Sequence, residues 1–144
     1  MKHALVVTAC FCLVMAGCGT YSETRVTKLN SPPGTIAIGE FKGNDPGIAQ
    51  FFADTIAGQL SAGGLKIITD QNQADIVITG AVSYKTDYWS GHINDWILTA
   101  KTKEGQIVAM VEFHEGYLDI GHKWPKEIVP ELAQRLSKAL RNVR

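Results

Sequence analysis

Residues 35–64 read TIAIGEFKGNDPGIAQFFADTIAGQLSAGG and join an apolar strand to an amphipathic helix. The run at residues 35–41 is short and apolar, which favours a buried strand. Asp45 can cap the first free N–H groups of a helix, and Pro46 suits its first position. Four apolar residues then follow at helical spacing: Ile48, Phe52, Ile56 and Leu60. Gly63-Gly64 predicts the end of this helix.

The rest of the chain predicts further strands and a second helix. The strands are expected at residues 65–69, 75–84, 93–102 and 106–114. The last two form a hairpin around Lys103-Glu104-Gly105, where glycine can adopt positive φ. A C-terminal amphipathic helix is expected to begin near Pro130, because proline is not tolerated deep inside a helix. The order β-α-β-β-β-β-α predicts an α/β (α+β) two-layer sandwich. We expect a mixed sheet of about four to five strands, with two main helices packed on one face.

The first residues have the features of a secretory signal. Lys2 precedes an apolar run at residues 4–16, which is too short to cross a hydrocarbon core of about 30 Å but matches a signal-peptide core. The run ends in Met15-Ala16-Gly17-Cys18, which resembles the bacterial lipobox. That resemblance implies removal of residues 1–17 as a lipoprotein signal peptide. It also implies transfer of diacylglycerol to Cys18, which finally bears three acyl chains, palmitate among them.

The segment after Cys18 predicts where the protein resides. Residue 19 is Gly and not Asp, which by the sorting rule of this lipoprotein class favours the outer membrane. Residues 18–33 are expected to be the lipidated cysteine and a short tether of at most roughly 50 Å. Residues 34–144 are expected to form a single periplasmic α/β domain. The alternative is an ordinary signal peptide in which Cys18 is incidental.

Composition limits the classes of function. The chain has 14 Lys+Arg and 14 Asp+Glu, so it is formally neutral and lacks the basic footprint of a nucleic-acid-binding protein. Cys10 and Cys12 are expected to leave with the signal peptide, and Cys18 to carry lipid. The mature domain is therefore expected to contain no disulfide and no cysteine metal site.

The series of motifs resembles a known superfamily. It comprises residues 35–41, Asn44-Asp45-Pro46-Gly47, residues 65–70 and residues 74–80. Together they resemble bacterial envelope lipoproteins with a domain like the amino-terminal domain of TolB. That group includes the curli-secretion lipoprotein, the lipoprotein activators of penicillin-binding proteins, a polysaccharide-export lipoprotein and the lipoprotein of the LPS translocon. The resemblance implies an α/β fold and an accessory role in the cell envelope.

Aromatic residues gather in one part of the chain and supply the interface candidates. These candidates are Tyr84, Tyr88, Trp89 and Trp96. Tyr and Trp bury much area while losing few rotamers, which is why they dominate binding hot spots. Tyr88 and Trp89 fall in a loop and are the stronger candidates. For Trp96 and Trp124 the alternative is that they pack on the sheet or hold the C-terminal helix in place.

No catalytic or metal-binding motif is recognisable. His92, His114 and His122 lack the convergent spacing of a zinc site, and no serine lies in a nucleophile elbow. Residues 39–47 follow a strand and open a helix, yet they match neither GxGxxG nor the P-loop. We therefore predict a non-enzymatic protein with no cofactor and no metal.

These inferences predict an outer-membrane-anchored periplasmic lipoprotein. It would act as a non-enzymatic accessory or scaffold for envelope assembly or export, with LPS, polysaccharide, secretion or peptidoglycan machinery as the candidate systems. Its expected partners are outer-membrane lipid, through acylated Cys18, and an envelope protein. The alternative is a small periplasmic ligand-binding or hydrolytic lipoprotein with a pocket at Trp89, His92, Asp95 and Trp96. A third alternative is homo-oligomerisation into a ring.

Overall fold

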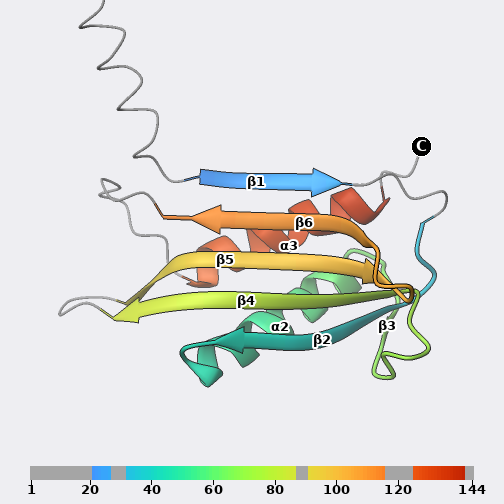
Figure 1. Ribbon diagram of the computed structural model, residues 1–144, viewed down its shortest axis with the longest axis horizontal. Helices are drawn as coiled ribbons and strands as arrows, with labels where there is room; N and C mark the ends of the chain where they lie inside the picture. Colours follow the sequence, from blue (N-terminus) through green and yellow to red (C-terminus); the bar gives the residue numbers. More distant parts are fainter. Residues whose placement is uncertain (1–20, 27–31, 87–90, 116–124, 142–144) are drawn as a thin grey trace, which may run out of the picture.

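The computed structural model describes residues 21–26, 32–86, 91–115 and 125–141. They form one six-stranded sheet in the order β1-β6-β5-β4-β2-β3, with two helices (Figure 1). The elements are β1 (Tyr21–Val26), β2 (Ile36–Gly43), α2 (Pro46–Ala62), β3 (Ile67–Ile68), β4 (Ile76–Thr86), β5 (Gly91–Thr102), β6 (Ile107–His114) and α3 (Pro125–Arg141). In the described ranges, neither helix is long and apolar enough to cross a membrane.

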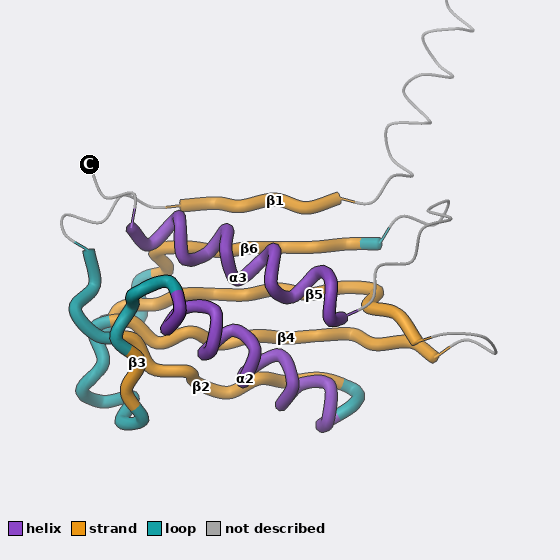
Figure 2. The backbone as a smooth tube through the Cα atoms, turned by 180° about the vertical axis from the view of Figure 1, so that it is seen from behind, coloured by secondary structure: helices purple, strands orange, loops and turns teal. Residues whose placement is uncertain are grey.

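Both helices lie on the same face of the sheet, and none of the described elements covers the other face, which is called the uncovered face below (Figure 2). β2 runs parallel to β3 and β4, while the neighbouring pairs from β4 to β1 are antiparallel. This arrangement confirms the predicted α/β two-layer class and its mixed sheet. The sheet is larger than the predicted four to five strands, because β1 adds an edge strand.

The turn from β2 into α2 forms as the sequence predicts. Asp45 is the N-cap, and its Oδ1 accepts a hydrogen bond of 3.0 Å from the Ile48 N–H. Pro46 occupies the first turn, where its missing N–H has no effect on the helix. The helix ends at Ala62 with Gly63 as its C-cap, and Gly64 follows with a φ of 83°, a conformation that glycine adopts without strain.

The central strands alternate between the two faces. Ile76, Ile78 and Val82 of β4 are buried beneath the helices, whereas Val77 and Thr79 lie on the uncovered face and are half-buried. β4 and β5 pair along nearly their whole length. The predicted hairpin between β5 and β6 is also present, with a φ of 81° at Gly105.

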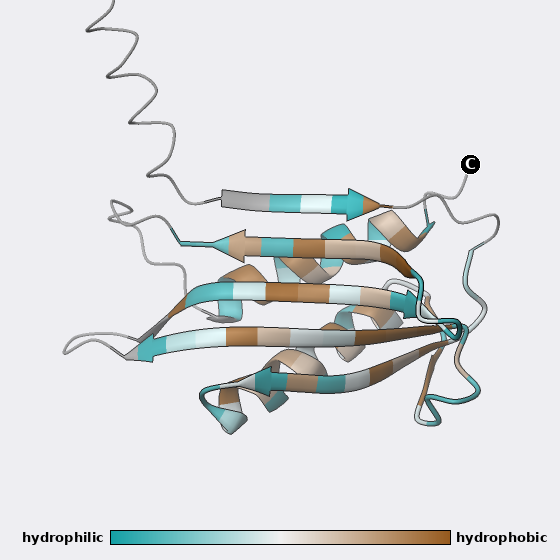
Figure 3. Ribbon diagram, viewed as in Figure 1, coloured by the Kyte–Doolittle hydropathy of each residue, from teal (hydrophilic) through white to brown (hydrophobic). Residues whose placement is uncertain are grey.

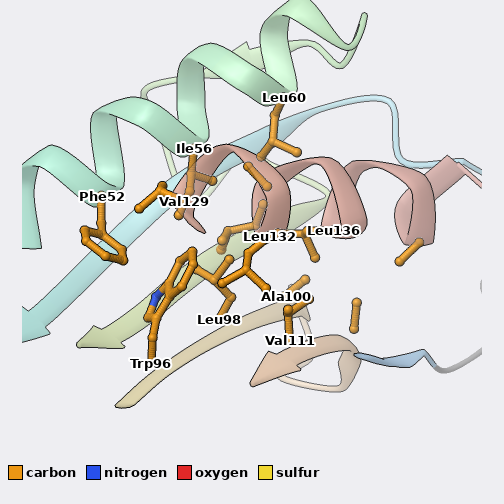
Figure 4. Packing of buried hydrophobic residues seen from close by; sticks show 14 of the residues in the cluster. Phe52, Ile56, Leu60, Trp96, Leu98, Ala100, Val111, Val129, Leu132 and Leu136 are labelled. Carbon is orange, nitrogen blue, oxygen red and sulfur yellow. The ribbon is translucent and has the colours of Figure 1, made fainter. Parts of the chain in front are cut away.

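The core lies between the sheet and the two helices (Figure 4). Phe52 of α2 and Trp96 of β5 meet edge to face, with ring centroids 4.6 Å apart and planes at 89°. Ile56 and Leu60 of α2 extend this contact, and Leu132 packs from α3. All five side chains are at most 1% exposed. The core therefore depends on residues that join α2, α3 and β5.

Three predicted boundaries differ from the structure. Part of the predicted tether, Tyr21–Val26, is a strand paired antiparallel with β6. β3 has only two residues, because β2 pairs with it only at Ile36 and Ala37. α3 begins at Pro125, so Pro130 lies in its second turn. There the missing Pro130 N–H leaves only the carbonyl of Lys126 without its usual donor, which a helix near its start tolerates.

Asp75 joins the starts of β2 and β4. Its carboxylate accepts hydrogen bonds from the Thr35 N–H at 2.8 Å and the Thr35 hydroxyl at 3.1 Å. The Asp75 N–H in turn donates to the Thr35 side chain at 3.1 Å. These hydrogen bonds stabilise the charged carboxylate and hold the pKa of Asp75 below its ordinary value, with Lys103 adding a weaker favourable charge.

The two adjacent phenylalanines of α2 provide a matched test of the core. Phe52 is fully buried and Phe51 is 40% exposed. We predict that Phe52→Ala lowers the free energy of unfolding by about 3–5 kcal/mol through lost burial and a residual cavity. Phe51→Ala should lower it by about 1 kcal/mol or less. Urea denaturation followed by circular dichroism measures both, and equal losses would contradict this packing.

Asp75 predicts a pH-dependent stability. Its pKa in the folded state is below the unfolded value, so its contribution is complete well above pH 3.8 and is lost as the pH falls below that value. We predict that Asp75→Asn is less stable than wild type at pH 7. We expect the two to converge as the pH falls from 7 to below 3.8, because the folded carboxylate then protonates. Thermal unfolding of both proteins across this range measures the difference. A gap that stays constant with pH would refute this role.

Candidate interaction surface

Hydrophilic and hydrophobic residues both occur along the strands of the sheet (Figure 3), and those of the uncovered face are of mixed polarity. Its centre is formed by half-buried or exposed residues from three strands: Thr79, Ala81, Ile97, Thr99, Met110 and Glu112. A shallow depression of about 330 Å³ lies over β4 and β5. Lys42 and Lys101 border it. The face is therefore open and polar enough to remain in water, and flat enough to accept a macromolecule.

A contact between a histidine and a carboxylate marks one end of this face. The Nδ1 atom of His114 lies 2.6 Å from Oδ1 of Asp95, and both side chains are 46% exposed. The side-chain amide of Asn94 donates to the other Asp95 oxygen at 2.7 Å. Ser83 is paired with Asp95 from the other side, so the order across the strands is Ser, Asp, His. A nucleophile triad needs the imidazole between the hydroxyl and the carboxylate, and this order does not provide it.

The described histidines and acids do not gather further. Within residues 21–26, 32–86, 91–115 and 125–141, no three His, Cys, Asp or Glu side chains converge as metal ligands.

The aromatic candidates lie in different environments. Trp96 is 1% exposed and packs on Phe52, so it belongs to the core, as the packing alternative has it. It cannot contribute to a surface contact, because the alternation along β5 points its side chain towards the helices. Tyr84 is half-buried against the same core. Tyr88 and Trp89 lie outside the described residues, as does Cys18.

The pocket of the ligand-binding alternative does not form as expected. Asp95 and Trp96 are neighbours on β5 and therefore point to opposite faces of the sheet. Asp95 is on the uncovered face, and Trp96 is beneath the helices. The side chains of Trp89 and His92 lie outside the described residues. Asp95 and Trp96 thus cannot line the same pocket.

A groove runs along the outer edge of β2. It has a volume of about 710 Å³, with residues 38–43 of β2 on one side and the start of α2 on the other. Small side chains of α2, Ala49, Ala53 and Ala57, border it and leave room beside the strand. β3 covers only the first two of the eight residues in β2. In the part of the chain that the structure describes, no strand pairs with the other six on this side.

On the other edge of β2, the side chain of Asn44 hydrogen-bonds to the backbone of β4. Its side-chain oxygen accepts the Tyr84 N–H at 2.8 Å, and its amide donates to the Tyr84 carbonyl at 2.5 Å. Asn44 thus continues the pairing of β2 with β4 by one residue beyond Gly43. β2 is thus paired with β4 except at a register shift between Ile38 and Phe41, and its other edge faces outwards, into the groove.

The opposite edge of the sheet is β1, which the sequence analysis missed. It carries charged residues, as edge strands commonly do. Arg25 Nε lies 2.8 Å from Glu23 Oε1, and a second guanidinium nitrogen lies 3.7 Å from Glu112 of β6. The hydrogen bond from Arg25 holds the pKa of Glu23 below its ordinary value. The sequence predicts this strand only weakly. Glu23 and Arg25 alternate with Thr24 and Val26, but the segment lacks the continuous apolar face by which a half-buried strand is recognised.

Comparisons with known proteins relate the fold to bacterial structures. No protein-family model matches this sequence, and no curated protein matches it significantly. The PelC dodecamer from Paraburkholderia phytofirmans is similar in structure, with a TM-score of 0.62 and 14% identity over 87% of this chain and 99% of that chain. A DUF4136 family protein from Bacteroides thetaiotaomicron has a TM-score of 0.59 and 12% identity, over 86% of this chain and 98% of that chain.

A third structure shares the fold as part of a longer protein. This PDZ domain protein from Parabacteroides distasonis has a TM-score of 0.55 and 13% identity, over 82% of this chain and 36% of that chain. At these identities the likeness shows the fold alone. The fold of this domain is therefore one that other bacterial proteins also adopt.

Proposed function

We propose that this chain is an outer-membrane lipoprotein whose domain faces the periplasm and acts as a non-enzymatic scaffold. Its role would be in envelope assembly or export, with LPS, polysaccharide, secretion or peptidoglycan machinery as the candidate systems. The observation that carries the proposal is the lipobox-like Met15-Ala16-Gly17-Cys18 directly ahead of a domain with the fold of PelC. The open face and the free strand edges provide the binding surface.

The position of β1 brings the domain close to its anchor. β1 begins at Tyr21, three residues after Cys18. Three residues span at most about 11 Å, so a lipid on Cys18 holds the start of β1 near the headgroups. Confinement to this layer raises the effective concentration of the domain for a partner in the same membrane. A partner across the peptidoglycan lies beyond this reach.

Self-association is part of the proposal. The similar PelC structure is a dodecamer, and it shares nearly its whole length with this domain. Three acyl chains anchor a protein far more firmly than one, so copies would be concentrated in one plane. Rotation about an axis normal to that plane keeps every anchor in the membrane, which favours a ring as the assembly.

Lipid attachment tests this proposal. We expect the protein extracted with detergent from a Gram-negative envelope to have the mass of residues 18–144 plus a diacylglyceryl group on the Cys18 thiol and one further acyl chain on its amino group. Cys18→Ser should abolish the added mass, because no thiol remains to receive diacylglycerol. Intact-mass spectrometry measures both.

Gly19→Asp provides a matched control for localisation. It should keep the lipid but move the protein from the outer to the inner membrane in a sucrose gradient. Release of wild-type protein as an unlipidated soluble domain would instead support the ordinary signal peptide and overturn the proposal.

A further inference from the structure

The two edges of the sheet match each other in length. β1 has six residues and pairs only with β6, so its outer edge is open in the described structure. β2 offers residues 38–43 beyond the two that β3 covers, with a shift in its register against β4 between Ile38 and Phe41. We propose that copies of this chain join head to tail, with β1 of one copy added as an antiparallel strand to the free edge of β2 in the next. This inference rests on the proposed self-association and assigns its interface.

Strand direction supports this pairing. From β1 to β2 the sheet has three antiparallel steps and one parallel step, so β1 and β2 run in opposite directions (Figure 1). A second copy placed beside the first in the same orientation therefore presents its β1 antiparallel to β2. Its helices then lie on the same side as those of the first copy. The sheet and the helical layer both continue across the contact.

The charges on the two edges are complementary in that orientation. β1 carries Glu23 and Arg25 on the uncovered face, and β2 carries Glu40 and Lys42, which lie 3.3 Å apart. When Glu23 faces Lys42 of the next copy, Arg25 faces Glu40, because residue numbers rise along one strand as they fall along its antiparallel partner. A parallel arrangement would place like charges opposite each other, which destabilises a sheet. The Glu40 and Lys42 side chains are 70% and 72% exposed, so they are accessible to a neighbour.

The groove receives the other side of the added strand. Thr24 and Val26 pair with Val111 and Ala109, which are buried under the helices, so they lie on the helix side of β1. On β2 the helix side of the free edge is the groove beside α2. Val26 is 51% exposed in the single chain. Entry into the groove would remove this apolar side chain from water.

Head-to-tail pairing uses both edges, whereas a twofold pair uses one. Two β1 strands, or two β2 strands, could also meet antiparallel with opposite charges facing. Either dimer would leave the other edge open, together with the groove or the exposed Val26. A heterologous contact covers both, and its repetition closes a ring when the rotation between copies fits.

Disulfide trapping tests the interface. The variant Glu23→Cys/Lys42→Cys places thiols on facing strands of neighbouring copies, and the mature chain has no other free cysteine once Cys18 is lipidated. Mild oxidation of envelopes should give a ladder of dimers, trimers and larger species on non-reducing gels. Neither single variant should give more than monomer. Glu23→Cys/Gln134→Cys is the matched control, with the second thiol on the exposed side of α3.

Each other outcome overturns the pairing. Dimers from Glu23→Cys alone would show β1 meeting β1, and dimers from Lys42→Cys alone would show β2 meeting β2. Absence of crosslinks in a double variant with wild-type circular dichroism would show that neither edge binds a copy. Lipid on Cys18 with no ladder would defeat this inference and leave the anchor of the proposed function standing. A ladder of crosslinked species from protein that carries no lipid would support the pairing and overturn the lipid anchor of the proposed function.

Charge reversal provides a second, non-covalent test. Lys42→Glu should weaken association about tenfold, because Glu23 of the neighbour then faces a like charge. Glu23→Lys alone should weaken it similarly, and the double variant should regain most of the loss. Sedimentation velocity in detergent measures the three. Restoration in the double variant is specific to the β1–β2 contact, and its failure would refute the register.

Discussion

The packing of Phe52 on Trp96 is the contact on which the two-layer structure depends. It fixes α2 over the middle of the sheet, with the rings edge to face at 4.6 Å. α3 then packs beside α2 through Leu132 and its neighbours. Because both helices are used on this face, nothing described covers the other one. The uncovered face and the two open edges follow from this asymmetry, and they are the parts of the domain available to partners.

The edges are also where the chain meets its proposed anchor. β1 is both an edge strand and the first described element after Cys18, so a lipid on Cys18 would place this edge close to the membrane. Copies held in one layer meet in similar orientations, which is the condition for pairing β1 with β2. Edge strands usually carry charges that discourage association, but the charges here alternate in matching order on the two edges. The same residues can therefore exclude wrong partners and select a copy.

Local patterns in the sequence were sufficient to predict most helices and strands, but not the boundaries of β1, β3 and α3. The Asp45 cap, the apolar stripe ending at Leu60 and the turn at Gly105 depend on neighbours in the chain, so they could be predicted. β1 could not, because its residues become a strand only through pairing with β6, some 90 residues away. The candidate site shows the same limit. The residue type makes Trp96 an interface candidate, but its side chain is buried in the core, and burial is determined only by the fold.

The sequence by itself determined the class of fold, the cap and end of α2, the alternation of the central strands and the absence of a recognisable catalytic motif. Each depends on the identity and spacing of nearby residues. The tertiary structure alone decided which face stayed open, which strands became edges, and that Glu23-Arg25 and Glu40-Lys42 lie at opposite ends of one sheet. The physical reason is that strand order and register arise from pairings between distant segments. Hydrophobic periodicity specifies which side of a strand is buried, but not which strand lies beside it.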